Sequence, residues 1–463
     1  MTGILLYSRK PLLKADSDKT RRQNKFIETW INNKGKGTLE ASTGFGKTYV
    51  AILLIQKMQE RKADRTTLVV VPTLKLKSQW EDELLEYSIT GVKVVVINTV
   101  CKKNWVCSLL VLDEIHNYAS EVFGTVFQRV KYSFILGLTA TMERSDKKHY
   151  YIEIHCPVID RVGLSESLEK KFISDFMVYN VPVPMTDAEE AAYNKLNKQF
   201  YKFFALFEHS LDNAMKAVKD PTYRKIVAKR LNWTERDVMV FAMNFVRSLQ
   251  KRKQFLYNLQ GKAHITLKLL EALRLRTITF SEGVDYVNHL YERSKSYSVP
   301  YHSKLTKKVR TNYLKMFEDP SSGVRVIHTA KALDEGFNVE GIECALIISG
   351  TSTVRQNLQR MGRSLRFVEG KTGIIINLYV PDTQDERWLD KRQKDVPNIE
   401  WCDSAESLLQ LLRAEDQNIP ASSGFAELPI PLKGIPFSSE RPLWDHAAGF
   451  HNPEAVGGDN DGI

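Results

Sequence analysis

One eight-residue stretch constrains the fold of this chain more than any other. Residues 41–48 read Ala-Ser-Thr-Gly-Phe-Gly-Lys-Thr, and the apolar residues that follow recur at helical spacing. A glycine-containing turn at the start of a helix exposes backbone N–H groups, and the helix dipole adds positive potential there. The pattern predicts a strand–loop–helix unit that binds phosphate. The competing interpretation is a plain glycine turn before a core helix.

The residues of this loop have distinct expected roles. Gly44 and Gly46 let the backbone wrap closely around a phosphate, where a Cβ atom would obstruct it. Lys47 is placed to reach the β- and γ-phosphates of ATP, and Thr48 offers its hydroxyl to Mg²⁺. ATP and Mg²⁺ are therefore the predicted cofactors. The predicted nucleotide contacts in the loop are Thr43, Gly44, Phe45, Gly46, Lys47 and Thr48.

A pair of carboxylates, Asp113 and Glu114, follows the uncharged run 108–112. Short apolar runs of this kind predict buried parallel strands, and ligands of open α/β sheets bind at the carboxyl ends of strands. We expect Asp113 to hold Mg²⁺, and Glu114 to polarise the attacking water and to share in the metal site. A lone Asp-Glu pair is more often an acidic helix cap. The pair follows the phosphate loop by about the length of one βαβαβ unit, and this spacing favours a catalytic role.

The positive charge of the chain is concentrated in its middle. The 463 residues carry a net charge of +11, and residues 195–276 alone hold 18 Lys and Arg against 6 Asp and Glu. The last 46 residues reverse this balance, with 2 against 6. A clustered basic surface is typical of proteins that bind a polyanion.

Composition also argues against several classes of protein. No apolar stretch approaches the roughly 20 residues needed to span a bilayer, and the first ten residues lack the charge order of a signal peptide. The five cysteines are scattered without a Cys-x-x-Cys pair, which indicates reduced thiols and no zinc cluster. We expect a cytoplasmic protein without membrane contact.

Short apolar runs alternate with helical patterns in two separate regions, which predicts an α/β fold with two parallel sheets in tandem. The expected strands are 37–40, 68–72, 92–97, 109–112 and 134–138 in the first sheet, and 277–280, 324–328, 345–348 and 373–378 in the second. The predicted domains are 1–165 for the first sheet, 166–186 for a connector with an extra strand at 176–181, 187–272 for a helical insertion, 273–416 for the second sheet and 417–463 for a Pro-rich tail.

The insertion has two interpretations. It is a structural connector with a solvated basic face, or a module that grips nucleic acid or docks a partner. Its aromatic residues are spaced for core packing rather than base stacking; they include Trp233, Phe241, Phe245 and Tyr257. The tail contains six prolines and is expected to be extended, with apolar anchors that pack along the body.

Taken together, these segments resemble superfamily 2 helicases over about residues 20–400, because the family's signatures occur in the family's order. Ala41, in place of a first glycine, is the family's usual form. Residues 113–116, Asp-Glu-Ile-His, match a DExH box, and 359–366, Gln-Arg-Met-Gly-Arg-Ser-Leu-Arg, match the sixth motif. The resemblance implies two RecA-like domains that close on ATP.

The same resemblance assigns further roles in the first domain. Gln23 corresponds to the glutamine that contacts adenine, and His116 to the residue that couples ATP hydrolysis to movement. Thr139 and Thr141, within Leu-Thr-Ala-Thr, belong to the coupling segment. Three residues fall in the segment that touches the nucleic-acid backbone: Pro72, Thr73 and Gln79.

In the second domain, the resemblance places Arg363 and Arg366 as arginine fingers and Gln359 near the γ-phosphate. An isolated Arg-x-x-Arg pair would more often be a solvated helix face. Glu335 and Gly336 lie in the fifth motif and are expected at the nucleotide, although Asn338 stands where an acidic residue is usual. The expected nucleic-acid contacts are Ser281, His302 and Thr329.

Residues 136–146 are most similar to the XPB-like and UvsW-like DNA helicases, and the compact chain resembles phage-encoded branched-DNA helicases; Met142 stands where that group usually has proline. We therefore expect an ATP-dependent helicase or translocase that unwinds or branch-migrates forked and branched DNA in replication, recombination or repair. The expected partner is DNA that is single-stranded, forked or branched. A double-strand translocase subunit of a restriction or remodelling assembly and an ATP-gated clamp are the alternatives, and RNA remains open as a substrate. No protein partner is predicted, and a monomer is the simplest expectation.

Overall fold

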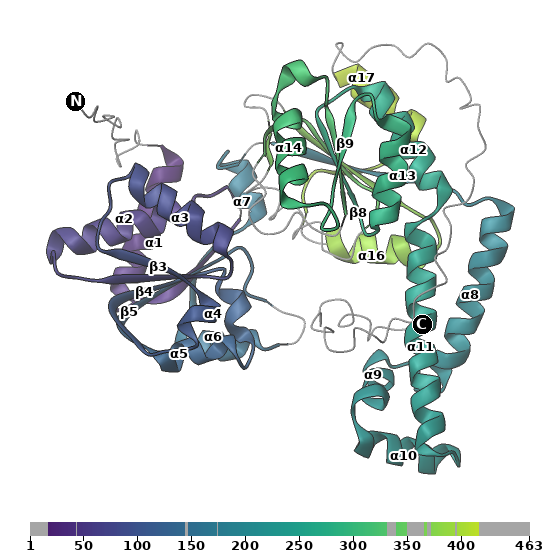
Figure 1. Ribbon diagram of the computed structural model, residues 1–463, viewed down its shortest axis with the longest axis horizontal. Coiled ribbons are helices and arrows are strands. Elements are labelled where there is room, and N and C mark those ends of the chain that lie inside the picture. The colour runs from purple at the N-terminus through teal and green to yellow at the C-terminus, as the bar shows by residue number, and fades with distance from the viewer. Residues whose placement is uncertain are drawn as a thin grey trace.

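The computed structural model describes residues 17–42, 44–143, 147–173, 175–330, 339–349, 365–367, 372–393 and 396–415. Two α/β bodies lie side by side, and a group of helices projects from the second (Figure 1). Each body is built on one parallel sheet, so the predicted fold class is confirmed. The predicted tail, 417–463, lies outside the described residues.

The first sheet has six parallel strands in the order β3-β2-β4-β5-β1-β6. The central strands are apolar because helices cover both faces; every residue of β2 is buried. The strand β6 was not predicted, since Asp160 and Arg161 interrupt its apolar pattern. The strands are β1 Lys36–Ala41, β2 Thr67–Val71, β3 Val92–Val96, β4 Trp105–Asp113, β5 Val130–Thr139 and β6 Val158–Val162.

Two apolar layers enclose this sheet. One layer contains Phe26, Val50 and Trp80 from three helices: α1 Asp18–Asn32, α2 Lys47–Arg61 and α3 Leu74–Glu86. The other contains Tyr118 and Ile152. Its elements are α4 Ile97–Val100, η1 Ile115–Ala119, η2 Phe123–Thr125, α5 Val126–Arg129 and α6 His149–His155.

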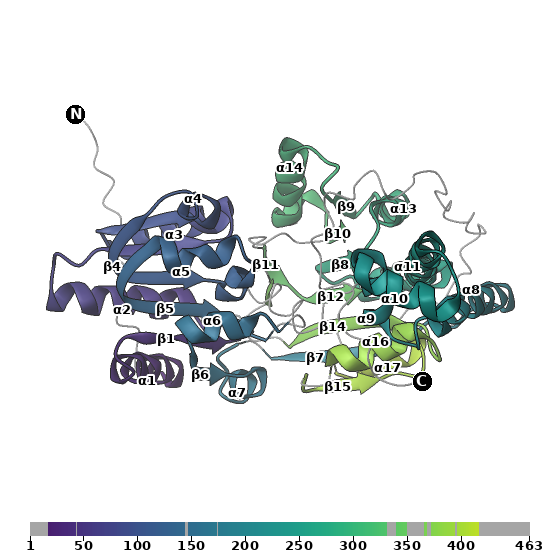
Figure 2. The same cartoon turned by 90° about the horizontal axis from the view of Figure 1, so that it is seen from below.

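The second sheet has seven parallel strands in the order β15-β7-β14-β12-β8-β10-β9 (Figure 2). The strand β7 occupies the position of the expected extra strand, and its Phe176 pairs with Gly373 of β14. The strands are β7 Phe176–Pro182, β8 Thr277–Ser281, β9 Ser298–Tyr301, β10 Val326–Ala330, β12 Cys344–Ile347, β14 Gly373–Tyr379 and β15 Ile399–Trp401. A separate two-stranded ladder joins β11 Val339–Ile342 to β13 Leu365–Phe367.

Helices cover the second sheet as well. Leu269, Leu290 and Leu408 share one apolar layer, and Phe317 and Leu389 share the other. The helices of the first layer are α12 Gln260–Leu273, α13 Val284–Ser294 and α17 Ala405–Glu415; those of the second are α14 Lys307–Glu318 and α16 Gln384–Gln393, with η3 Pro320–Ser322 after α14. Among the helices that the structure describes, none is long and apolar enough to cross a membrane.

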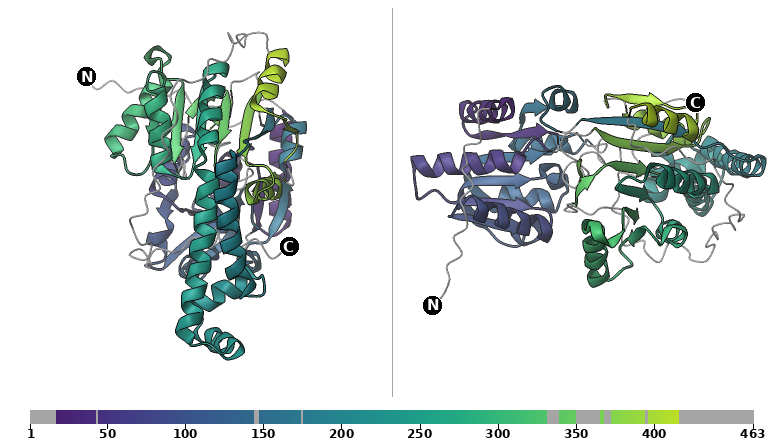
Figure 3. Two further views of the ribbon diagram at one scale, coloured as in Figure 1. Left: turned by 90° about the vertical axis from the view of Figure 1, so that its right-hand side faces the viewer. Right: turned by 90° about the horizontal axis from the view of Figure 1, so that it is seen from above.

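The projecting helices lie between β7 and α12 in the chain. They are α8 Asp187–Ala205, α9 Leu211–Lys219, α10 Pro221–Leu231 and α11 Glu235–Tyr257, and the long pair α8 and α11 extends away from the sheet (Figure 3). Their own core is aromatic: the rings of Phe204 and Phe245 stack at 5.4 Å. Core packing of Phe245 and Tyr257 is confirmed, because both side chains are buried.

Candidate active site

The phosphate loop joins β1 to α2, which begins at Lys47. Gly44 and Gly46 have φ angles of +85° and +91°, in the left-handed region that favours glycine. A Cβ atom at Gly46 would also lie 2.8 Å from the side-chain nitrogen of Gln23. The loop therefore requires glycine at position 46 for both conformation and space. Thr43 lies outside the described residues.

Gln23 holds the loop against α1. Its side chain is 3% exposed, and Nε2 donates to the carbonyl oxygen of Phe45 at 2.7 Å. This contact places Gln23 beside the phosphate loop. Its contact with adenine stays a prediction.

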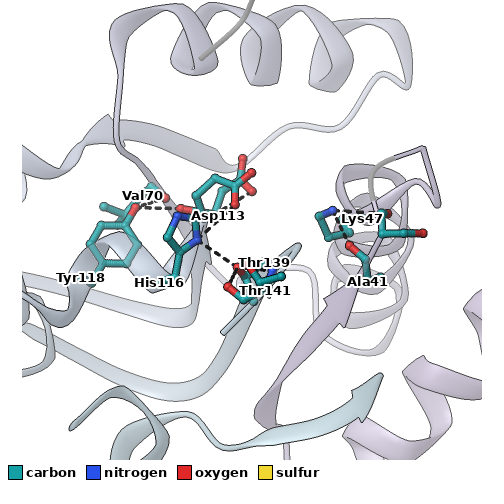
Figure 4. A network of polar contacts seen from close by, with 10 residues as sticks. Ala41, Lys47, Val70, Asp113, His116, Tyr118, Thr139 and Thr141 are labelled. Atoms are coloured by element: carbon teal, nitrogen blue, oxygen red, sulfur yellow. Dashed lines mark hydrogen bonds and ion pairs between the residues drawn. The ribbon is translucent and has the colours of Figure 1, made fainter. Parts of the chain in front are cut away.

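Lys47 is buried at the start of α2. Its Nζ donates to the carbonyl oxygens of Ala41 at 2.7 Å and Ser42 at 3.5 Å (Figure 4). A buried ammonium group is costly unless it has charged or hydrogen-bonding partners. A polyphosphate anion in this loop would be a charged partner for Lys47, next to these two carbonyl oxygens.

The carboxylates Asp113 and Glu114 stand at the carboxyl end of β4 and are 2% and 8% exposed. The indole Nε1 of Trp80 donates to Asp113 Oδ2 at 2.9 Å, and the Glu114 backbone N–H donates to Asp113 Oδ1 at 3.0 Å. These donors orient the carboxylate and leave acceptor capacity for a cation. The role of Trp80 leaves no local pattern in the sequence, because it depends on a hydrogen bond between residues 33 apart.

Glu114 has a left-handed backbone conformation, with φ 50° and ψ 51°. A non-glycine residue pays about 1–3 kcal/mol for such strained geometry, and it persists where surrounding structure enforces it. Tyr118 belongs to that structure, since its hydroxyl oxygen lies 3.0 Å from the carbonyl oxygens of both Val70 and Asp113 and shares its one proton between them. Strain at a buried carboxylate is typical of catalytic positions.

His116 connects the carboxylates to the neighbouring strand. Its Nδ1 lies 3.4 Å from Glu114 Oε2 and 3.0 Å from Thr139 Oγ1 (Figure 4). The Thr139 hydroxyl also donates to the carbonyl oxygen of Thr141 at 2.7 Å. The structure thus brings the three predicted coupling residues into one polar chain, which begins at Glu114.

The donor set suits magnesium bound jointly by protein and nucleotide. Mg²⁺ commonly takes one or two carboxylates and completes its shell with phosphate and water oxygens. Asp113 and Glu114 supply the carboxylates, and Thr48 is a half-buried hydroxyl on the first turn of α2. Within the described residues, no group of three or more His, Cys, Asp and Glu side chains is arranged to hold a metal.

The predicted nucleic-acid contacts of the first domain begin at the carboxyl end of β2. Pro72, Thr73 and Gln79 are all half-buried. Thr73 caps α3, with Oγ1 accepting from the backbone N–H of Leu76 at 3.3 Å. The hydroxyl proton of Thr73 is not used in that bond, so a donor to a phosphate oxygen remains.

The corresponding residues of the second domain are more deeply placed. Ser281 and His302 are each 5% exposed, and Thr329 is 1% exposed, with its hydroxyl donating to the carbonyl oxygen of Thr279 at 2.8 Å. His302 Nε2 lies 3.1 Å from Asn288 Oδ1, and burial lowers the pKa of His302. These side chains support the carboxyl edge from within, and their nucleic-acid contacts stay predictions.

Besides Thr43, five predicted site residues cannot be placed by their side chains. Gln359, Arg363, Glu335 and Gly336 lie outside the described residues, and only the backbone of Arg366 is described, in β13.

A buried histidine gives the second sheet a pH-dependent stability. His328 bridges Thr279 Oγ1 at 2.8 Å and Ser294 Oγ at 2.9 Å, and burial lowers its pKa to about 3. Unfolding frees this histidine to bind a proton near pH 6.5, so the unfolded state binds more protons between these two values. Stability is full above about pH 6.5 and falls by up to about 1.4 kcal/mol per unit as pH drops toward 3.

Hydrogen exchange of peptides from β8 and β10 should therefore accelerate steeply between pH 6.5 and 4.5, after correction for the intrinsic rate. We expect His328→Gln to flatten this dependence. An unchanged slope in the variant would assign the pH effect to other groups.

The connector contacts both the phosphate loop and the second domain. Its helix α7, Leu164–Glu169, lies between the two bodies (Figure 1). Ser167 Oγ lies 2.5 Å from Ser42 Oγ, and Arg22 Nε donates to Glu166 Oε1 at 2.9 Å. Leu168 packs into the core of the second domain. Residues beside the nucleotide loop are thus linked to the second sheet through one short helix.

Comparison with known proteins agrees with this architecture. Residues 17–104 match the family model for the type III restriction enzyme res subunit, and residues 261–368 match the helicase conserved C-terminal domain. The DNA 3'-5' translocase XPB2 of Sulfurisphaera tokodaii is 28% identical over 408 residues, which cover 83% of this chain and 86% of that protein. A putative ATP-dependent RNA helicase of African swine fever virus is 33% identical over 27% of this chain and 28% of its own length.

Solved structures support the same fold. Yeast Dbp5 bound to RNA and ADP BeF3 superposes with a TM-score of 0.52 at 14% identity, over 85% of this chain and 92% of that one. The Hef helicase domain of Pyrococcus furiosus gives 0.51 at 13% identity, over 79% and 96%. The two sheets are RecA-like domains in tandem, and they define a nucleic-acid-dependent ATPase of the helicase class. Within that class, the chain is similar to superfamily 2 helicases of the XPB type.

Proposed function

We propose that this chain is an ATP-driven DNA helicase or translocase that unwinds or branch-migrates forked and branched DNA. The observation that carries the proposal is the polar chain from Glu114 through His116 to Thr139. It joins the position of the attacking water to the adjacent strand of the same sheet. The similarity to a DNA translocase over most of both chains supports DNA as the substrate.

Each residue of the site has a role in this mechanism. Lys47 neutralises phosphate charge, and Glu114 polarises the water that attacks the γ-phosphate. Magnesium, held by Asp113, Glu114 and Thr48 together with the nucleotide, would offset the negative charge of the transferring group. Arg363 and Arg366 approach from the second domain as the two domains close.

The network supports a coupling mechanism. Hydrolysis changes the charge beside Glu114, and His116 passes this change to Thr139 and Thr141. The helix α7, held at Ser42 and Arg22, links the nucleotide loop to the second domain. Closure then shifts the nucleic-acid contacts of one domain against those of the other, which moves the protein along a strand.

The second candidate function uses the same ATP-driven motor in a different biological role. The match of residues 17–104 to a restriction-enzyme subunit favours a double-strand translocase that serves a larger assembly. Measured ATPase stimulation by single-stranded, duplex and branched DNA and by RNA separates these candidates. Strand displacement on a labelled fork, with and without ATP, distinguishes a helicase from an ATP-gated clamp. Failure of every nucleic acid to stimulate turnover would refute the proposal.

The projecting helices are the proposed site of substrate selection. Lys225 and Lys229 are exposed on α10, and α10 lies at the end of the projection far from the sheet (Figure 1). Each phosphate contact contributes about 0.9 to the slope of log affinity against log salt on duplex DNA. We expect Lys225→Ala with Lys229→Ala to lower the slope by about 1.8, measured by fluorescence anisotropy on a labelled fork.

The control for this measurement is Lys25→Ala with Lys57→Ala, which removes the same charge from exposed positions on α1 and α2 of the first domain. The control slope should equal that of the wild type. Equal slopes for both double variants would restrict the insertion to a structural connector.

A further inference from the structure

The first domain also carries a basic surface, in addition to that of the projecting helices. It lies at the edge of the first sheet opposite the ATP site. We define the amino-edge patch as Lys93, Lys103, Trp105, Arg129 and Lys131. These residues lie at or just before the amino ends of β3, β4 and β5. In the sheet, β4 and β5 are direct neighbours, and β2 separates β4 from β3.

An aromatic ring stands at the centre of the patch. Lys103 Nζ lies 4.5 Å and Lys93 Nζ 5.1 Å from the ring centroid of Trp105, which is half-buried. Arg129 is held beside them, because its Nη1 donates to the side-chain oxygen of Asn104 at 3.4 Å. Two ammonium groups around one indole combine positive charge with a stacking surface.

The other face of the same strands adds an exposed pair. Val106 pairs in register with Lys131, and Val106 is 79% exposed. Both side chains stand where β4 and β5 extend beyond β2, since Thr67 of β2 pairs with Leu109. The two strands therefore form a protruding ribbon with a basic and apolar surface.

The two sequence segments that carry the patch contain basic residues but no acidic ones. Residues 87–112 and 122–142 contain five Lys and Arg and no Asp or Glu. In the neighbouring loop, Asp64 lies 3.5 Å from Lys62, which offsets its charge. A cluster of cationic side chains attracts a polyanion, and aromatic rings between basic side chains suit a strand with unpaired bases.

The patch is remote from the proposed path of the translocated strand. That path crosses the carboxyl edge, at Thr73 and the neighbouring strand ends. The strand β4 runs from Trp105 to Asp113, nine residues, which corresponds to about 26 Å in an extended strand. One nucleic-acid strand on the carboxyl edge does not account for these cations.

We propose that the amino-edge patch binds a second, single-stranded segment of the nucleic acid. The phosphates contact Lys93, Lys103, Arg129 and Lys131, and a base stacks on Trp105. The inference rests on the proposed function and deepens it, because a forked or branched substrate presents a second strand that one track cannot hold. The patch would then keep the displaced strand from pairing again.

Charge removal tests the patch directly. In Lys93→Ala/Lys103→Ala/Lys131→Ala, three single-strand contacts of about 0.7 each lower the salt slope by about 2. Between 50 and 200 mM salt, the wild type should therefore lose about 15-fold more affinity for a fork with a long single-stranded arm than the variant loses. A fork that lacks this arm should give the same slope for both proteins. Equal slopes on the long-armed fork would overturn the proposal, and would leave an acidic protein as the ligand.

The triple variant also separates this inference from the proposed function. ATPase stimulation by a short oligonucleotide, which fills only the main track, should remain within about twofold of the wild type. A wild type that no nucleic acid stimulates refutes the proposed function, whereas the binding measurement above needs no ATP and judges the patch alone.

A crosslink locates the strand. Val106→Cys carries a benzophenone probe at the exposed ribbon, and Leu411→Cys on α17, 37% exposed, carries the same probe on the second domain. The unsubstituted protein, treated with the same reagent, reports labelling of the native thiols. We expect ultraviolet light to crosslink the displaced arm to position 106 at least tenfold more than to position 411. Equal yields, or a yield unchanged when the arm is removed, would contradict the proposal.

Discussion

Replacing Glu114 with glutamine is expected to reduce nucleic-acid-stimulated ATP turnover by about 10²–10⁴-fold. The substitution keeps the size of the side chain and its ability to accept a hydrogen bond, but removes the charge that we propose polarises the attacking water. Since Glu114 is 8% exposed and lies beside His116, it is protected from bulk solvent. Steady-state phosphate release, with saturating single-stranded DNA, measures the effect.

Binding should survive this substitution. The affinity for DNA and for ATP should stay within about threefold of the wild type, because the phosphate loop and the strand-contacting segments are untouched. Glu121→Gln, at an exposed position in the loop that follows, is the matched control and should retain full turnover. Lys47→Ala should also abolish turnover, whereas Lys57→Ala, exposed on the same helix, should not. Normal turnover in Glu114→Gln would refute the assignment of this site.

Replacing Asp385 with alanine is expected to destabilise the second domain by about 3–5 kcal/mol, because a buried charge loses its partner. Lys262 is fully buried on α12, and its Nζ lies 2.6 Å from Asp385 Oδ2 and 3.0 Å from the carbonyl oxygen of Ile348. The same Asp385 oxygen accepts from the backbone N–H of Val380 at 3.2 Å. Urea unfolding, followed by hydrogen exchange of α12 and α16 peptides, measures the loss.

Two further variants test whether the unpaired buried charge is the cause of this loss of stability. Lys262→Met with Asp385→Leu removes both charges and should recover most of the lost stability, since the desolvation penalty disappears with the pair. Glu406→Ala breaks the exposed ion pair between α17 and Lys268 on the same α12, and should cost at most about 1 kcal/mol. A double variant as unstable as Asp385→Ala would show that shape, rather than charge, holds these helices.

The features that can be predicted from the sequence are those that depend on residues close together in the chain. The glycines of the phosphate loop, the run before Asp113 and the spacing of the Phe residues each leave a pattern within a few residues. Strands β9 and β15 were missed because they are short, with four and three residues at the edges of the sheet. The helical period of the insertion was clear, yet it did not show that α12 packs on the second sheet.

Not every cation of the basic segment 195–276 lies at the surface. The count for residues 195–276 treats every cation as part of a surface, but Lys262 and Arg252 are 0% and 4% exposed. Arg252 lies over the ring of Phe200, 3.7 Å from its centroid, and donates to Asn197. These two cations contact buried groups in the interior and do not add to the surface charge. Contacts of this kind, like those of Trp80 and Tyr118 with Asp113, depend on how distant segments meet.

The position of β7 in the second sheet determines the order in which the two domains can finish folding during synthesis. Its Asn180 bonds with Asn377 of β14, 197 residues later, and with Gln393 of α16, and all three side chains are buried. A ribosome therefore releases β7 long before either neighbouring strand exists, while the first domain already has its six strands. Until β14 emerges, the apolar face of β7 has no sheet to join. A nascent chain arrested before Gly373 would thus hold a finished first domain beside an unfinished second one, which makes this interval the time of greatest need for a chaperone.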